Sequence, residues 1–262
     1  MKIYKAYAKV NIFLKITGTR GNYHEIISRF MRVESLYDEL LFVKKNEDEF
    51  KIIGDFSCET KDNTIYKAYQ ALLKNTKSEE LENFMKTYAI EVKKFIPAFA
   101  GLGGGSSDSA TYLKMCNEVL NLGLSVEELA KIGLEVGADV PFFIYGYDSA
   151  NVGGIGEIVE EYKEKLLEFE VRTPDVKIST PKVYTTYRKD FFSPITKEES
   201  NKLKSMDSLD ALNSYSIDEI NDLYNPALQE YKELGKHYKN GWFFSGSGSS
   251  FFRINTKKNK NN

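Results

Sequence analysis

Residues 97–110 read Pro97-Ala98-Phe99-Ala100-Gly101-Leu102-Gly103-Gly104-Gly105-Ser106-Ser107-Asp108-Ser109-Ala110. Four glycines fall within the five residues 101–105. Glycine has no Cβ, so a backbone rich in it can turn its N–H groups toward a bulky anion. A helix that begins directly after the glycines would add unpaired N–H donors and a partial positive charge. The stretch therefore predicts a cradle for a polyphosphate, and the alternative is a flexible linker or a tight turn.

The segments on either side of this loop favour the cradle over a linker. Residues 88–95 are typical of a strand, and Ala110, Leu113, Cys116, Val119 and Leu120 keep approximately helical spacing. The loop is not a GxxxxGK[ST] phosphate loop, because no lysine follows its last glycine. We expect a strand, a glycine loop and a helix, in that order.

Length and charge set the broad class of the protein. A chain of 262 residues is long enough for one large domain or two ordinary ones. A net charge of −2 gives no reason to expect a nucleic-acid partner. The two cysteines, Cys58 and Cys116, have no metal-ligand spacing, and we expect a reduced, buried thiol at Cys116.

The chain shows no sign of a membrane or secretory segment. Residues 1–5 lack the apolar core of a signal peptide, and no apolar run approaches the ~20 residues that a membrane-spanning helix needs. We therefore expect a cytoplasmic protein without a membrane partner. The sequence assigns no oligomeric state and no metal ligands.

The first half of the chain predicts long strands followed by capped helices. Residues 2–16 read as extended, 17–22 as a turn, and 30–43 as a second strand broken around Asp38-Glu39. Asp62-Asn63 is a candidate cap for a helix that continues through Leu73. Ser125 begins a capping box whose helix ends at Gly137.

The second half is less regular. Three glycines cluster in residues 149–157 before a short charged helical pattern, and a domain boundary is expected at about 146–160. Residues 176–180 read as a strand, and a helix is expected to stop before Pro226. Residues 242–254 read as β structure that Ser245-Gly246-Ser247-Gly248-Ser249-Ser250 interrupts.

Three motifs in order carry a family resemblance. The first is Ala8-Lys9-Val10-Asn11-Ile12-Phe13-Leu14 with Tyr23-His24-Glu25, the second is the glycine loop, and the third is the 245–250 run. Together they resemble the GHMP kinases, which include galactokinase and the homoserine, mevalonate and phosphomevalonate kinases. One departure is Gly21-Asn22, where the family usually has Asp-Gly before the Tyr-His pair.

The resemblance implies a fold and its division. It implies an α+β, two-domain GHMP kinase fold with the active site in the interdomain cleft. Residues 1–150 would form an N-terminal domain like domain 2 of ribosomal protein S5, with the ATP-binding glycine loop. Residues 151–262 would form a ferredoxin-like C-terminal domain.

Further stretches narrow the implied activity. Gly137-Ala138-Asp139-Val140-Pro141-Phe142, the run from Ser179 to Tyr184, and Asn221-Asp222-Leu223 resemble one branch of the superfamily. The resemblance implies ATP- and Mg²⁺-dependent phosphorylation of the 2-hydroxyl of a methylerythritol that carries a cytidine diphosphate, on the non-mevalonate route to isoprenoid precursors. The alternatives are a kinase for another small alcohol, of homoserine or phosphomevalonate type, and a non-catalytic nucleotide-binding module.

Two charged residues match the family's catalytic positions. The resemblance makes Asp139 the group that accepts the proton of the attacking alcohol, and Lys9 its charge partner. Without the resemblance, Asp139 would read as an Asx-turn residue and Lys9 as the solvated face of a strand. Asn11, two residues after Lys9, shares its side of a strand and is expected to bind the substrate.

The remaining predicted contacts lie at the two ends of the substrates. For ATP they are Pro97, Ala98, Phe99, Ala100, Gly101, Leu102, Gly103, Gly104, Gly105, Ser106 and Ser107, with Asn63 and Lys94 at the adenine end. The resemblance places Tyr23, His24 and Tyr184 at the cytidine end, where aromatic rings would stack on the pyrimidine, and Thr180 near the ribose or the cytosine. The alternatives are helix capping for the serines and Asn63, and core packing for the aromatic residues.

Overall fold

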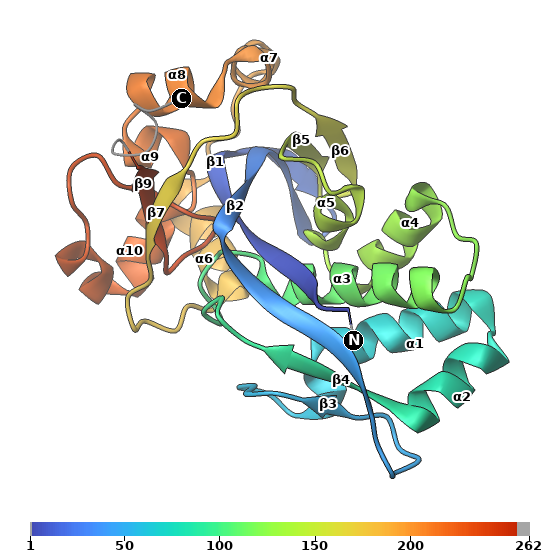
Figure 1. Ribbon diagram of the computed structural model, residues 1–262. Helices are drawn as coiled ribbons and strands as arrows, with labels where there is room; N and C mark the ends of the chain where they lie inside the picture. Colours follow the sequence, from blue (N-terminus) through green and yellow to red (C-terminus); the bar gives the residue numbers. More distant parts are fainter. Residues whose placement is uncertain (1, 256–262) are drawn as a thin grey trace. The chain divides into compact units, whose positions relative to one another are not determined.

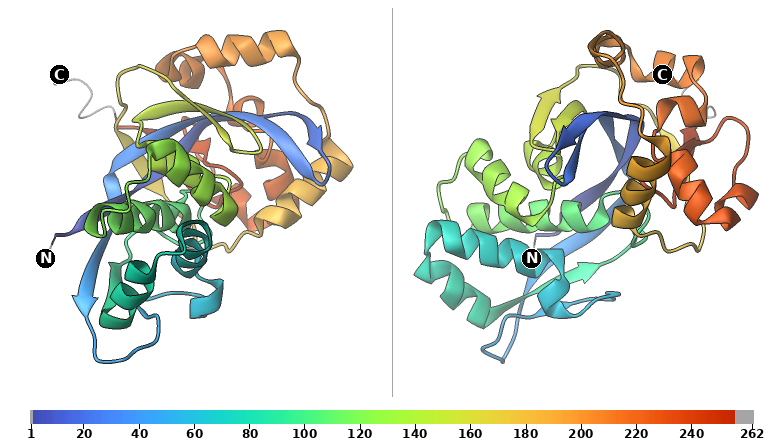
Figure 2. Two further views of the ribbon diagram at one scale, coloured as in Figure 1. Left: turned by 90° about the vertical axis from the view of Figure 1, so that its right-hand side faces the viewer. Right: turned by 180° about the vertical axis from the view of Figure 1, so that it is seen from behind.

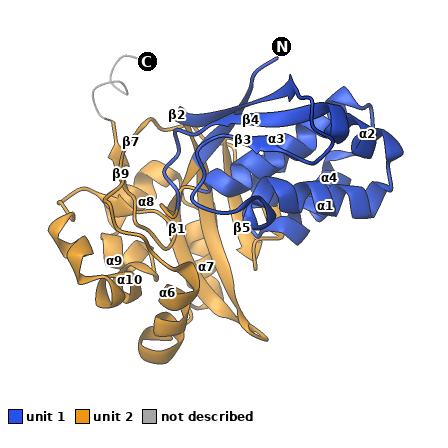
Figure 3. Ribbon diagram, turned by 90° about the horizontal axis from the view of Figure 1, so that it is seen from below, with its two compact units in different colours: residues 1–8, 36–98, 103–146 blue, residues 9–35, 99–102, 147–262 orange. Residues whose placement is uncertain are grey.

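The computed structural model describes residues 2–255, which form two compact units (Figure 3). Unit 1 holds residues 2–8, 36–98 and 103–146, and unit 2 holds residues 9–35, 99–102 and 147–255. The strands β1 (Tyr4–Arg20) and β2 (Tyr23–Lys44) each pass from one unit into the other. The division at residues 150 and 151 stays a prediction.

In unit 1, helices cover a small sheet (Figure 1). Within it β2 pairs antiparallel with β4 (Tyr88–Lys93), and β3 (Ile52–Ile53) lies parallel to β4. Helix α3 packs against α1, α4 and α5. The helical segments are η1 (Thr60–Asp62), α1 (Thr64–Thr76), α2 (Glu79–Thr87), α3 (Gly104–Val119), α4 (Val126–Val136) and α5 (Val140–Tyr145).

Local capping signals in unit 1 are confirmed. The side chain of Asn63 accepts a hydrogen bond from the N–H of Ile65 and caps α1. Ser125 and Glu128 form a reciprocal capping box, and Gly137 is the C-cap of α4. The strand, loop and helix order around the glycines is also confirmed, as is the buried Cys116.

The expected break in the second strand is wrong, because β2 continues through Asp38 and Glu39. The Asp38 side chain is fully buried and accepts hydrogen bonds from the N–H groups of Phe95 and Ile96. It also contacts the ammonium of Lys94. A buried carboxylate persists in a strand when hydrogen bonds and a cation compensate its charge.

Unit 2 contains two sets of paired strands. β2 pairs antiparallel with β5 (Ser149–Gly154), which pairs with β6 (Ile158–Glu161). β9 (Phe251–Ile254) lies between β7 (Phe169–Arg172) and β8 (Phe243–Phe244). The charged helix expected after residues 149–157 is wrong, because Gly154 and Gly156, with φ +65° and +122°, turn the chain back as a hairpin.

Of two further expectations in unit 2, one is wrong and one is confirmed. Residues 176–179 form no strand, because no strand of residues 2–255 pairs with them, and Ile178 is buried just before α6 begins at Thr180. Helix α9 (Ile217–Ile220) ends before Pro226, as expected, and Pro226 itself lies in the first turn of α10 (Tyr224–Glu230). Proline is tolerated there because the N–H groups of a first turn have no partner within the helix.

The core of unit 2 combines residues of β1, β8 and β9 with residues of its helices, which Figure 2 draws in orange. Leu14, Ile178, Trp242, Phe244 and Phe251 belong to it. The helical segments of this unit are α6 (Thr180–Thr186), the π-helical turn η2 (Tyr187–Phe191), α7 (Lys197–Ser205), α8 (Ser208–Ser214), α9 (Ile217–Ile220), α10 (Tyr224–Glu230) and η3 (Lys232–Lys236). Across residues 2–255, none of the helices has the length and apolarity that crossing a bilayer requires.

Candidate active site

The glycine loop runs directly into α3. Gly103 is the N-cap of that helix at φ +71°, a left-handed conformation that favours glycine. Ser107 is buried, and its N–H donates to the carbonyl of Gly103, so its backbone belongs to the helix. Ser106 is half-buried. Of the two serines, Ser106 is therefore the more accessible at the helix start.

Two of the glycines leave room for protein atoms. A Cβ on Gly104 would lie 2.9 Å from Cγ2 of Ile96, and one on Gly105 would lie 3.1 Å from Oγ1 of Thr64. The Thr64 hydroxyl also donates to the carbonyl of Gly105 at 2.8 Å. The absent side chains thus let the first turn of α3 pack closely against Ile96 and Thr64 within unit 1.

The residues that open the loop differ in exposure. Ala100 and Leu102 are buried, and Pro97 and Ala98 are exposed. Phe99 is 57% exposed and has φ +55°, which is unusual for a bulky residue. A strained backbone of this kind persists only where the surrounding structure fixes it.

Asp139 lies in the short connection between α4 and α5, at the N-cap position of α5. Its side chain makes no capping hydrogen bond to that helix, so the structure gives it no such local structural role there. The same connection begins at Gly137, where a Cβ would lie 3.8 Å from Oγ of Ser106. Within unit 1, the chain that carries Asp139 therefore starts beside the N-terminal turn of α3.

The side chains of both residues predicted for the adenine end, Asn63 and Lys94, are bonded to other groups of the protein. Asn63 is buried and caps α1. The ammonium of Lys94 binds Oδ2 of Asp108 at 2.6 Å and also contacts Asp38. Their contact with ATP stays a prediction; within the protein, Asn63 caps α1 and Lys94 belongs to this ion-pair cluster.

In unit 2, Lys9 is held in a buried polar chain on β1. Only 3% of Lys9 is exposed, so it does not lie on a solvated face. Its ammonium donates to Oδ1 of Asn11 at 2.6 Å and lies 4.4 Å from the centre of the Phe30 ring. Asn11 in turn donates to the hydroxyl of Ser28 at 2.9 Å. These contacts fix the direction of Lys9 before any ligand binds.

The 245–250 loop connects several predicted residues of unit 2. The Ser250 N–H donates to the carbonyl of Ala100 at 3.1 Å. A Cβ on Gly246 would lie 3.3 Å from Oδ1 of Asn11. The hydroxyls of Ser247 and Thr180 are 2.7 Å apart. This loop therefore brings residues near Asn11 and Thr180 together, although they are far apart in the sequence.

Asn221 holds the same loop and was not predicted as a site residue. Its Nδ2 donates to the carbonyls of Phe244 at 2.8 Å and Gly246 at 3.0 Å. Its Oδ1 accepts from the N–H of Leu223 at 2.9 Å. The Asn221-Asp222-Leu223 stretch entered the sequence reading only through the family resemblance.

Replacing Gly101 with Ala is expected to destabilise unit 2. Gly101 has φ +73°, and a Cβ there would lie 2.1 Å from the carbonyl oxygen of Ser245. Backbone strain and this clash should together lower the free energy of unfolding by about 3 kcal/mol or more, measured by urea denaturation.

Gly123 provides the matched control for this substitution. It has φ +71°, but a Cβ there would have no heavy atom within 4 Å. Gly123→Ala should therefore cost only the conformational term, about 1–2 kcal/mol. Equal losses in the two variants would show that the close contact between Gly101 and Ser245 does not matter.

Aromatic rings gather at the predicted cytidine end. His24 stacks on Tyr184, with ring centres 5.1 Å apart and planes at 27°. His24 and Tyr187 lie edge to face with ring centres 5.7 Å apart, and Tyr23 is 65% exposed. Partial burial, with the nearby charge of Arg188, lowers the pKa of His24, so the ring is neutral at pH 7. A neutral stacked ring pair suits an uncharged base.

Arg188 is a neighbour of this group that the sequence reading missed. Its Nη2 donates to the carbonyl of Asn22 at 3.2 Å, and its Nε points to Nε2 of His24 at 3.4 Å. It comes from the π-helical turn after α6. No local pattern in the sequence marks it, because it meets His24 only through the fold. Gly21, at φ +59°, takes the left-handed position in the nearby turn.

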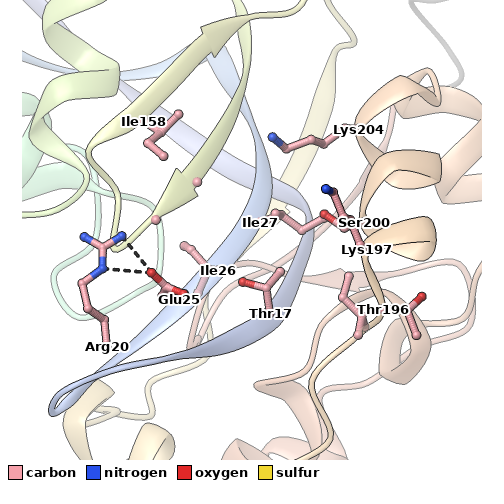
Figure 4. A pocket seen from close by; sticks show the side chains of 13 residues that line it. Thr17, Arg20, Glu25, Ile26, Ile27, Ile158, Thr196, Lys197, Ser200 and Lys204 are labelled. Atoms are coloured by element: carbon pink, nitrogen blue, oxygen red, sulfur yellow. Dashed lines mark hydrogen bonds and ion pairs between the residues drawn. The ribbon is translucent and has the colours of Figure 1, made fainter.

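A separate pocket of about 330 Å³ lies in unit 2 (Figure 4). Thr17, Arg20 and Glu25 line it from the β1–β2 hairpin, and Lys197 and Lys204 line it from α7. Arg20 pairs with Glu25 at 2.8 Å within it. None of the predicted site residues lines this pocket.

Comparisons with known proteins give the family. The model for the N-terminal domain of GHMP kinases matches residues 63–147. A 4-diphosphocytidyl-2-C-methyl-D-erythritol kinase of Sulfurimonas denitrificans is 65% identical, over 99% of this chain and 99% of its own length. A protein of the same name from Helicobacter pylori is 40% identical, over 99% of this chain and 97% of its own length.

Solved structures agree with these relatives. A 4-(cytidine 5'-diphospho)-2C-methyl-D-erythritol kinase has a TM-score of 0.70 at 27% identity, covering 97% of this chain and 90% of that chain. The mevalonate kinase of Methanococcus jannaschii has a TM-score of 0.62 at 17% identity, covering 99% of this chain and 92% of that chain. The second likeness shows the fold alone.

Proposed function

The chain belongs to the 4-diphosphocytidyl-2-C-methyl-D-erythritol kinases within the GHMP kinases, and on this basis we propose which of its residues bind each substrate and which take part in phosphoryl transfer. The activity is ATP-dependent phosphorylation of the 2-hydroxyl of that cytidine diphosphate alcohol, on the route to isoprenoid precursors. This conclusion rests on the 65% and 40% sequence identity, over nearly the full chain, to kinases of that name. The fold is the mixed α/β fold of GHMP kinases. Its finer description as two named domains with a cleft between them stays a prediction.

We propose that residues 103–107 bind the phosphates of ATP. The first N–H groups of α3 have no carbonyl partner within the helix, and the helix dipole adds positive charge there. Both features favour a polyanion. The half-buried Ser106 adds a hydroxyl at the same helix start.

Mg²⁺ is proposed to accompany ATP. In kinases this ion is held largely by substrate phosphates and water, with few protein oxygens. The hydroxyl of Ser106 is an oxygen donor of the kind that such an ion or its water accepts, so the residues present fit. The ion would neutralise charge on the transferred phosphoryl group.

We propose that Asp139 and Lys9 act on the reacting groups. Phosphoryl transfer requires aligned reactants and stabilised negative charge more than covalent chemistry. Asp139 orients the acceptor hydroxyl and takes its proton late, because an ordinary carboxyl is a far weaker base than an alkoxide. Lys9, aimed by Asn11, stabilises the charge that develops on the phosphoryl oxygens.

We propose that the rings of Tyr23, His24 and Tyr184 hold the cytosine of the acceptor. Stacking on an aromatic ring is worth about 1–3 kcal/mol per base. The exposed Tyr23 is the ring with most surface to offer, and the His24–Tyr184 stack supplies a rigid neighbour. Thr180, tied to Ser247, is proposed to contact the nucleoside from the start of α6.

Replacing Tyr184 with Ala is expected to raise the acceptor KM by about fivefold to a hundredfold, with little change in the KM for ATP. The reason is that the substitution removes the stacking partner of His24. Steady-state kinetics with each substrate varied in turn measures both constants. Tyr184→Phe keeps the ring and should behave like the wild type. Tyr238→Ala, at an exposed ring outside the site, is the control. An unchanged acceptor KM in Tyr184→Ala would remove this residue from the site.

A panel of acceptors tests the function as a whole. Purified protein with MgATP should show its highest kcat/KM for the cytidine diphosphate alcohol, and far lower values for homoserine and phosphomevalonate. A preference for an acceptor without cytidine would assign the chain to another kinase. Nucleotide binding without any turnover would make it a binding module.

A further inference from the structure

Three ionisable side chains form a largely buried cluster in unit 1. The ammonium of Lys94 contacts Asp38 and lies 2.6 Å from Oδ2 of Asp108. The exposed fractions of these side chains are 18% for Lys94, 0% for Asp38 and 3% for Asp108. Two carboxyl groups therefore share one cation in a site with little solvent.

The cluster lies directly behind the first turn of α3. A Cβ on Gly104 would lie 3.6 Å from Nζ of Lys94. Asp38 also holds the chain that leads into the loop, because its Oδ1 accepts from the N–H groups of Phe95 at 2.5 Å and Ile96 at 2.8 Å. No lysine follows the last glycine of the loop. The cation nearest the start of α3 in this cluster is Lys94, on the side of the helix opposite the phosphates' expected position.

Asp108 is the unbalanced member of the cluster. Its Oδ1 is buried and makes no hydrogen bond within the part of the chain that the structure describes. Burial raises the pKa of Asp108 to about 7, although Lys94 opposes that shift and Asp38 adds to it. Near neutral pH this carboxyl is therefore partly protonated.

We propose that Asp108 is a positioning residue for the donor nucleotide. It acts through Lys94, which lies beside the first turn of α3, and its protonation state sets the net charge of the cluster behind the phosphate loop. The proposal rests on the proposed binding of ATP phosphates at residues 103–107. When Asp108 is neutral, Asp38 alone balances Lys94. When Asp108 is ionised, the cluster carries a net negative charge that repels the phosphates.

The sign of the pH dependence follows from these charges. A bound polyanion disfavours the ionised carboxylate, so nucleotide binding raises the pKa of Asp108 further and takes up a proton. Several other charged side chains on α3 and on the helices packed against it have partners of their own, and Lys67 of α1 and Glu127 and Lys131 of α4 are exposed. Lys74 of α1 pairs with Glu135 of α4, and Lys114 of α3 donates to the carbonyl of Phe143 in α5.

Isothermal titration calorimetry tests the proposal on the wild-type protein. MgATP is titrated at pH 7.5 in two buffers of different ionisation enthalpy, which gives the number of protons taken up. If binding shifts the pKa by one unit, we expect about half a proton per site, and a Kd about tenfold weaker at pH 9 than at pH 6. Titration of free MgATP with acid corrects for the ionisation of the nucleotide.

Asp108→Asn separates this role from a purely structural one. Asn keeps an oxygen for Lys94 but has no proton to exchange, so the Kd should be nearly independent of pH. At pH 9 the variant should bind MgATP more tightly than the wild type, by up to about tenfold, whereas simple loss of structure would weaken binding. Asp48→Asn, at an exposed position of unit 1, should keep the wild-type pH dependence.

Two results would overturn the proposal. The first is wild-type binding without proton uptake, and the second is the same pH dependence of Kd in Asp108→Asn as in the wild type. Failure of the proposed function would look different, because the wild type would then not bind MgATP at any pH.

Discussion

Replacing Asp139 with Asn is expected to lower kcat by about 10²- to 10⁴-fold, because the amide cannot take the proton of the acceptor hydroxyl. The Kd for ATP should change little, since the phosphates are assigned to residues 103–107. Asp139 sits between α4 and α5, and its side chain does not cap α5, so the substitution removes no helix cap. Single-turnover kinetics, with nucleotide binding measured separately, gives both quantities.

A control substitution makes this result specific. Asp210→Asn changes an exposed carboxylate of α8 in unit 2 and should leave kcat within about twofold of the wild type. A normal kcat in Asp139→Asn would show that Asp139 is not the base. Loss of ATP binding in that variant would instead give Asp139 a role at the donor phosphates.

Replacing Lys9 with Met is expected to lower kcat by about 10²- to 10³-fold with a smaller effect on either KM. The reason is that Lys9 would stabilise charge that develops mainly in the transition state. Met has nearly the same length and suits a buried position, so the fold should tolerate it. Steady-state kinetics measures the split between kcat and KM.

Arginine at the same position is a second informative change. Lys9 is buried and donates to Asn11 at 2.6 Å, so the larger guanidinium of Lys9→Arg should not restore the rate. Lys131→Met, on the exposed face of α4, is the matched control and should behave as the wild type. A Lys9→Met enzyme with unchanged kcat would place Lys9 outside the reaction.

Local signals in the sequence predicted local structure well. Asn63 and Ser125 cap helices because a side-chain oxygen meets N–H groups only two or three residues ahead. The helical spacing from Ala110 onward predicted a helix soon after the glycine run, and α3 begins at Gly104. Such interactions involve neighbours in the chain, so they can be inferred from the residues in order.

Interactions between distant segments caused the errors and omissions. Asp38 read as a strand break because its partners, Lys94 and the N–H groups that follow, lie more than 50 residues away. Lys9 could not be distinguished from a surface lysine until its burial was known. Arg188 was missed because only the fold brings it to His24.

The position of the new phosphate on the product tests the central claim most directly. Carbon 2 of the methylerythritol carries a methyl group and no hydrogen, so a 2-phosphate has no proton three bonds from phosphorus. A proton-coupled ³¹P spectrum of the reaction with MgATP should therefore show one new phosphomonoester singlet, and it should be absent with Asp139→Asn on the same time scale. A new doublet or triplet, or inorganic phosphate alone, would contradict transfer to the 2-hydroxyl.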